Sequence, residues 1–98
     1  MSGQKENKNI LVVDDSLASR HIVADMLSAL GYEFSTAENG KAALVELTKN
    51  QDFLVVIADV HMDQMDGIEL LKHIRQELPS IDVIIMTGQG KVFFFRYY

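Results

Sequence analysis

The residues of this chain best suited to chemistry are three carboxylates and one hydroxyl, each placed at the end of a short apolar run. They are Asp14, Asp15, Asp59 and Thr87. Carboxylates gathered in one pocket repel one another, and some of them stay protonated unless a cation is near. One or two carboxylates with open positions for water and phosphate suit Mg²⁺, and an aspartate beside that ion can act as a nucleophile toward phosphorus. The Thr87 hydroxyl would then donate a hydrogen bond to a phosphoryl oxygen.

The apolar runs predict strands, and they alternate with segments of helical periodicity. The predicted strands are residues 10–13, 32–37, 53–58 and 83–86. The predicted helices run over residues 17–30, 41–49 and 68–78. This βαβαβαβ order implies an α/β fold with a parallel sheet, helices on both faces and right-handed crossovers. On the first helix, Ile22, Val23, Met26, Leu27 and Leu30 recur at helical spacing.

The fold brings the four polar residues to one edge of the sheet. In open α/β sheets, ligands bind outside the carboxyl ends of the strands, where strand order reverses. Each residue alone has an ordinary explanation, because aspartates at strand ends are commonly turn or helix-cap residues and Thr-Gly is a common turn. Four such residues at the carboxyl ends of three predicted strands favour a shared pocket.

Composition excludes several classes of protein. A chain of 98 residues, 48% hydrophobic and 23% charged, suits one globular domain, and its lack of cysteine excludes disulfide scaffolds, thiolate zinc sites and cysteine nucleophiles. Its net charge of −5 disfavours direct nucleic-acid binding through a positive field. The polar start and short apolar runs predict neither a signal peptide nor a membrane segment, so we expect a cytoplasmic protein. Residues 1–8 are expected to form a flexible arm.

The end of the chain is strongly aromatic and differs in composition from the rest. Five of the eight aromatic residues fall in the last six positions: Phe93, Phe94, Phe95, Tyr97 and Tyr98. Gly88 and Gly90 favour a tight hairpin, which would run this tail antiparallel to the fourth strand or exchange it with another copy. An exposed aromatic edge strand predicts a homodimer formed through the tail. The alternative is a tail without an evolved role.

Three segments together resemble the receiver domain of two-component response regulators. They are Ile10-Leu11-Val12-Val13-Asp14-Asp15-Ser16, Asp59-Val60-His61-Met62-Asp63-Gln64-Met65-Asp66-Gly67 and Ile84-Ile85-Met86-Thr87-Gly88. The resemblance covers residues 9 to about 90 and implies a flavodoxin-like, doubly wound parallel sheet of strand order 2-1-3-4.

The resemblance also implies a role for each residue of the pocket. Asp59 would accept a phosphoryl group from a histidine kinase or a histidine phosphotransfer protein. Asp15 and Asp59 would bind Mg²⁺ directly, Asp14 would act mainly through water, and the backbone carbonyl of His61 would be a further ligand. Thr87 would be the switch hydroxyl that moves toward the phosphate.

The chain departs from the family pattern at two places. Asp63 stands where the family usually has proline, which adds a carboxylate and loosens the loop. The pattern normally continues through a helix, a fifth strand ending in an invariant lysine, and a last helix, so we expect the receiver domain to be incomplete after residue 90 and followed by a separate tail, residues 91–98. Lys91, expected opposite Thr87, is a candidate substitute for the missing lysine, and an ordinary loop lysine is the alternative.

Several functions fit these residues to different degrees. The first is a phosphoacceptor signalling module that assists only its own phosphorylation and is not an enzyme acting on other substrates. The second is a phosphorylation-impaired receiver that works by binding or dimerisation, which the missing lysine favours. A Mg²⁺-dependent phosphatase would need a carboxylate two positions after the nucleophile, where His61 stands. A flavin-binding module would need a phosphate-binding loop after the first predicted strand. Asp14 and Asp15 stand there, and they would repel the phosphate.

Overall fold

Strands and helices alternate along the chain until the last two strands, which follow one another directly. The computed structural model describes residues 9–50 and 52–96. Its elements are β1 (Ile10–Val13), α1 (Leu17–Ala29), β2 (Phe34–Ala37), α2 (Gly40–Lys49), β3 (Val55–Asp59), α3 (Gly67–Glu77), β4 (Asp82–Met86) and β5 (Val92–Phe95). The flexible arm predicted for residues 1–8, and Tyr97 and Tyr98 of the tail, lie outside the described residues.

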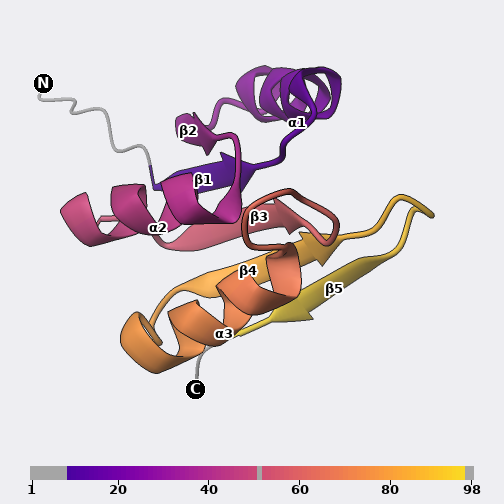
Figure 1. Ribbon diagram of the computed structural model, residues 1–98. Coiled ribbons are helices and arrows are strands. Elements are labelled where there is room, and N and C mark those ends of the chain that lie inside the picture. Colours follow the sequence, from indigo (N-terminus) through magenta and orange to yellow (C-terminus); the bar gives the residue numbers. More distant parts are fainter. Residues whose placement is uncertain (1–8, 51, 97–98) are drawn as a thin grey trace, which may run out of the picture.

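The strands form one sheet of order β2-β1-β3-β4-β5 (Figure 1). The first four strands are parallel to their neighbours, whereas β5 runs antiparallel to β4. This confirms the α/β class and the 2-1-3-4 order. The aromatic segment extends this order as an antiparallel fifth strand of the same chain, because a short hairpin cannot make the crossover that a parallel neighbour needs.

The main core lies between the sheet and the helices α2 and α3. Alternate residues of the strands point to this face, among them Val56 and Val83, and they meet Leu47 of α2 with Leu70 and Ile74 of α3. All five side chains are fully buried. This face therefore holds the strands, and with them their carboxyl ends, in a fixed register.

Helix α1 lies on the opposite face and covers only part of it. Its ends are well capped: Ser16 accepts a hydrogen bond from the N–H of Ser19, and Gly31, with φ of +85°, closes the C-terminal turn. However, α1 packs mainly against β1 and β2, and none of its residues is buried. Of the apolar residues at helical spacing, Val23 and Leu27 are half-buried, whereas Ile22, Met26 and Leu30 are exposed.

The hairpin between β4 and β5 is closed by its own turn at one end and tied to α3 at the other. At the turn, Gly90 has φ of +83° and the N–H of Thr87 donates to the carbonyl of Lys91. At the other end, the Arg75 guanidinium donates to the carbonyl oxygens of Pro79 and Phe95, at 2.9 and 3.0 Å. Phe95 packs against the core, whereas Phe93 and Phe94 are exposed.

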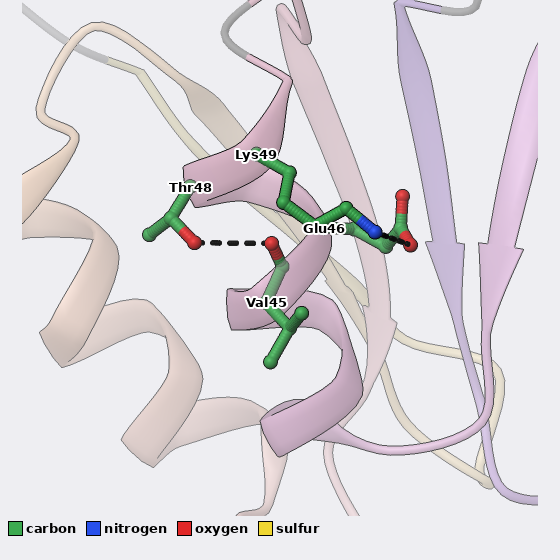
Figure 2. Close-up of polar contacts among 4 residues, drawn as sticks. All are labelled: Val45, Glu46, Thr48 and Lys49. Atoms are coloured by element: carbon green, nitrogen blue, oxygen red, sulfur yellow. Dashed lines mark hydrogen bonds and ion pairs between the residues drawn. The ribbon is translucent and has the colours of Figure 1, made fainter.

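The outer surface of α2 makes its polar contacts within the helix. Figure 2 shows the Thr48 hydroxyl donating to the carbonyl of Val45 at 3.0 Å, and Lys49 paired with Glu46 at 3.9 Å. These contacts join α2 to no other element, so this surface is a suitable place for control substitutions. Among the described residues, no helix has the length and apolar content that crossing a membrane requires.

Candidate functional site

Hydrogen bonds to its N–H, its carbonyl and its carboxylate hold Asp14 at the end of β1. Its N–H donates to the carbonyl of Ala37, and its own carbonyl accepts a 2.7 Å hydrogen bond from the Arg20 guanidinium. Its carboxylate accepts a hydrogen bond from the N–H of Ser16 at 3.0 Å. Asp14 is only 3% exposed, so its orientation is set by the fold rather than by solvent.

The environment of Asp14 disfavours its ionised form. Burial raises its pKa above the ordinary value, and the N–H of Ser16 offsets part of that effect. The nearby carboxylates of Asp59 and Asp15 raise the pKa further, and the charge of Arg20 lowers it by the smallest amount of these effects. Negative charge is therefore crowded at this edge of the sheet, and a bound cation would relieve it.

Asp59 is the last residue of β3 and begins the loop that leads to α3. The N–H of His61 donates to its carboxylate at 3.3 Å, and the N–H of Val60 donates to the carbonyl of Met86 in the neighbouring strand. Gly67 packs so closely beneath this loop that an added Cβ would collide with the carbonyl oxygen of Asp59. A glycine at position 67 therefore allows the loop to close under Asp59.

Asp15 is exposed and points toward the same loop. Its carboxylate accepts a hydrogen bond from the N–H of Asp63 at 3.0 Å. Proline, which the family pattern has at this position, lacks a backbone N–H and could not make this bond. Asp63 thus gives this chain a contact of its own between the end of β1 and the loop after β3.

Thr87 uses its side-chain oxygen to close the turn after β4. Its Oγ1 accepts hydrogen bonds from the N–H groups of Gln89 and Lys91, at 3.3 and 3.2 Å. Both bonds occupy the oxygen as an acceptor, so the hydroxyl proton is available to donate. Lys91 lies opposite Thr87 in the hairpin, and its side chain is exposed.

One pocket brings three of the expected residues together. It has a volume of about 210 Å³ and includes Asp14, Asp59 and Thr87 in its lining. Its other lining residues are Ser19, Ile22, Val23, Met86 and Gly88. None of these five was expected at the site from the sequence, although Ser19, Ile22 and Val23 share one helix face directly after the aspartate pair. Asp15, His61 and Lys91 do not line the pocket.

The donors of this pocket fit a hydrated magnesium ion better than a closed metal cage. Within residues 9–50 and 52–96, no group of three His, Cys, Asp or Glu side chains is arranged to hold a metal. Asp14 and Asp59 nevertheless face one pocket, and each contributes to crowding of negative charge there. Mg²⁺ commonly binds through one or two carboxylates and keeps several waters, so two carboxylates are sufficient.

A larger cavity, of about 560 Å³, lies near β2. Arg20, Glu38 and Glu46 supply its charged lining. It lacks Asp59 and Thr87, and we therefore place the candidate site at the smaller pocket.

The fold and the acidic pocket at the strand ends define an α/β domain suited to phosphoryl chemistry at an aspartate. Its sequence matches the response regulator receiver domain family over residues 10–96. The chain belongs to this family. It is thus a receiver domain of the kind used in two-component signalling.

Curated relatives include a transcriptional regulatory protein and a chemotaxis protein. The chain is 44% identical over 92 residues to the transcriptional regulatory protein ZraR of Klebsiella oxytoca, which covers 94% of the chain and 20% of that protein. It is 42% identical over 84 residues to a chemotaxis protein CheY homolog of Campylobacter jejuni, with 83% of the chain and 65% of that protein covered. The chain therefore spans about a fifth of the ZraR protein and less than two-thirds of the CheY homolog.

Solved structures show the same fold. The response regulator TrrA of Thermotoga maritima, in complex with Mg²⁺ and BeF, superposes with a TM-score of 0.78 at 36% identity, covering 83% of this chain and 70% of that one. The CheX–CheY–BeF3–Mg²⁺ complex of Borrelia burgdorferi gives a TM-score of 0.79 at 28% identity, covering 85% of this chain and 63% of that one. Receiver domains similar to this chain have thus been solved with magnesium and a beryllium fluoride.

Proposed function

We propose that this domain accepts a phosphoryl group on Asp59, in a Mg²⁺-dependent transfer from a histidine kinase or a histidine phosphotransfer protein in the cytoplasm. The observation that carries the proposal is the single pocket shared by Asp14, Asp59 and Thr87. These residues belong to three different strands or strand ends, and their meeting supports a common function.

Each residue of the pocket has a defined part in the proposed transfer. A carboxylate oxygen of Asp59 attacks phosphorus, so an O–P bond forms while the P–N bond of the donor phosphohistidine breaks. The Thr87 hydroxyl donates its proton in a hydrogen bond to a phosphoryl oxygen. Asp15, Asp59 and the carbonyl of His61 would hold Mg²⁺ directly and Asp14 mainly through water, and the ion would supply positive charge that offsets the phosphoryl oxygens.

Mass spectrometry of the intact protein tests this proposal. Incubation with Mg²⁺ and acetyl phosphate is expected to add the mass of one phosphoryl group, and Asp59→Asn is expected to abolish the addition. Asp52→Asn is the matched control, since Asp52 is an exposed aspartate outside the pocket. Addition that persists in Asp59→Asn would overturn the assignment of the acceptor.

The alternative is a receiver-like interaction module in which phosphorylation is impaired. One observation favours it: neither lysine nor arginine lines the pocket, and Lys91 is exposed outside it. Loss of a cation beside the developing phosphoryl charge costs about 2–4 kcal/mol of transition-state stabilisation, by analogy with oxyanion-hole donors. Failure of the wild-type protein both to gain mass and to bind beryllofluoride would favour this second function.

If Lys91 substitutes for the missing cation, Lys91→Met lowers the rate of phosphorylation while Lys72→Met leaves it unchanged.

We also propose that the tail forms a homodimer through the free edge of β5. The strand pairs with β4 on one side only, and residues 92–95 carry no charge. Because Lys91 faces β4, alternation along the strand turns the backbone groups of Val92 and Phe94 away from β4. Such an uncharged aromatic edge favours pairing with a second copy.

Light scattering over a range of protein concentrations tests the dimer. Phe94→Lys is expected to shift the protein toward monomer, because an edge lysine disfavours strand pairing. Val45→Lys, on the exposed surface of α2, is the matched control. A wild-type protein that stays monomeric at high concentration would rule out the dimer.

A further inference from the structure

The larger cavity, of about 560 Å³, lies beside the outer edge of β2 and shares no lining residue with the candidate pocket. Thr36 and Ala37 both line it, although adjacent residues of a strand point to opposite faces of the sheet. Its other walls also come from both faces, since Arg20 belongs to α1 whereas Ala42 and Val45 belong to α2. A cavity that touches both faces in this way lies at the edge of the sheet. We call it the β2-edge cavity.

The backbone of β2 presents hydrogen-bonding groups to this cavity. Within the part of the chain that the structure describes, β2 pairs with β1 alone and ends the sheet (Figure 1). The carbonyl of Ala37 accepts a hydrogen bond from the N–H of Asp14, so the backbone groups of Ala37 face β1. Because these groups alternate between the two sides of a strand, those of Thr36 and Phe34 face outward. An extended segment is the structure that such an edge binds.

The length of β2 limits the occupant to a short segment. The strand has four residues, Phe34–Ala37, and is about 13 Å long at 3.3 Å per residue. A segment of about four to six residues would pair along it, with its side chains alternately on the α1 side and the α2 side of the edge.

The charges around the β2-edge cavity favour a basic segment. Glu38 and Glu46 line the cavity, and the guanidinium of Arg20, which also lines it, already donates to the carbonyl of Asp14 at 2.7 Å. Among the residues that the structure describes, Glu38 forms no ion pair, and Glu46 lies 3.9 Å from Lys49, at the limit of a salt bridge. The whole chain is also acidic, with a net charge of −5. Lysine or arginine side chains of an occupant would therefore be attracted to the two glutamates.

We propose that the outer edge of β2 binds an extended, basic segment of a partner protein, which adds a strand beside Thr36 and places a lysine or arginine against Glu38 and Glu46. This binding goes beyond the proposed phosphoryl transfer, because it requires neither a phosphoryl group nor Mg²⁺. It also differs from the tail dimer, which uses β5 at the opposite edge of the sheet.

Fluorescence anisotropy with synthetic peptides tests the proposal on the full chain. The probe is a labelled six-residue peptide of alternating valine and lysine, which favours an extended conformation and carries positive charge. It is expected to bind the wild-type protein. A matched peptide with glutamate in place of lysine is expected to bind at least about tenfold more weakly, because its carboxylates then meet Glu38 and Glu46.

Substitutions of the two glutamates locate the charged contact. Glu38→Gln and Glu46→Gln are each expected to weaken binding of the lysine peptide about threefold, which is the effect of losing one partly exposed ion pair. Glu69→Gln is the matched control, since Glu69 is exposed on α3 and lies outside the cavity lining. The control is expected to bind the lysine peptide as the wild type does.

A pair of substitutions at Thr36 locates the backbone contact. Thr36→Pro removes the outward N–H and is expected to weaken binding at least about fivefold, the effect of one lost hydrogen bond. This N–H lies outside the ladder with β1, so the variant is expected to keep the wild-type circular dichroism. Thr36→Val keeps both the N–H and the branched side chain, and it is expected to bind as the wild type does. If Thr36→Pro fails to fold, Glu38→Gln still tests the site.

Three results would overturn the proposal. One is equal binding of the lysine and glutamate peptides, or no binding of the lysine peptide. Another is binding that a folded Thr36→Pro leaves unchanged, as a peptide bound at the edge of β5 would show. The third is an oligomer of the protein alone that Thr36→Pro dissociates, since a second copy would then occupy the edge of β2. All three are independent of the Asp59 mass measurement, so failure of phosphorylation and failure of strand addition can be told apart.

Discussion

The backbone N–H of Asp63 donates a 3.0 Å hydrogen bond to the carboxylate of Asp15, which lies 48 positions earlier in the chain. This bond joins the end of β1 to the loop after β3 and uses Oδ2 of Asp15, which does not line the acidic pocket. The proposed metal and the Asp63 N–H therefore compete for the same carboxylate.

Asp63→Pro is expected to strengthen Mg²⁺ binding, because proline removes the competing N–H and releases Asp15. A single hydrogen bond is worth about 1 kcal/mol, which corresponds to roughly a fivefold change in affinity. Isothermal titration calorimetry measures the Mg²⁺ affinity of the variant and of the wild type. Asp63→Asn keeps the N–H and removes the charge; if it changes the affinity as much as Asp63→Pro, the carboxylate of Asp63 rather than its N–H is responsible.

Asp14→Asn is expected to stabilise the Mg²⁺-free protein at neutral pH. The pKa of Asp14 in the folded protein is raised above 3.8, so ionisation of Asp14 destabilises the folded state. Below about pH 3.8, Asp14 is protonated in both the folded and the unfolded state, so the stability difference between Asp14→Asn and wild type does not depend on pH there. The stabilisation of Asp14→Asn relative to wild type grows as pH rises from about 3.8 through the raised pKa of Asp14, and it is constant above that pKa.

Urea unfolding between pH 3 and pH 8, without Mg²⁺, measures the difference between Asp14→Asn and wild type. Asp25→Asn is the control, because Asp25 is exposed on α1. A difference between Asp14→Asn and wild type that does not change with pH would contradict the assignment.

Gly67→Ala is expected to destabilise the protein by about 1–3 kcal/mol, in the range of overpacked interiors. The added Cβ would collide with the backbone carbonyl of Asp59, so either α3 or the loop must shift. Gly88→Ala is the control, since a Cβ there meets nothing within 4 Å. Urea unfolding compares the two variants, and equal effects would show that the close approach at Gly67 is unimportant.

Arg75→Met is expected to loosen β5 without unfolding the domain. It removes both hydrogen bonds from the guanidinium, including the one to Phe95 that holds the end of the hairpin. Hydrogen bonds to charged groups contribute about 1.5–3 kcal/mol. Native-state hydrogen exchange should therefore speed up at the amides of Phe93 and Phe95, which face β4. Lys72→Met, on the exposed side of α3, is the control, and equal acceleration in it would contradict the role of Arg75.

The sequence alone determined the class of fold and the edge of the sheet where the polar residues meet. Short β-branched runs that stop at Asp14 and before Asp59 predicted buried parallel strands, and parallel strands place their carboxyl ends together. Gly90 and the short link after β4 likewise predicted the antiparallel hairpin. These features depend on local periodicity and turn chemistry, which the order of residues carries directly.

Only the tertiary structure decided how the side chains are used. The sequence placed Ile22 and Met26 among apolar residues at helical spacing, but both are exposed, because a helix buries its apolar side only where another element lies against it. The contact between Asp15 and Asp63 joins loops far apart in the chain and uses a backbone N–H that any residue except proline would supply. Such contacts depend on how loops meet in space, and residue type and spacing carry no signal for them.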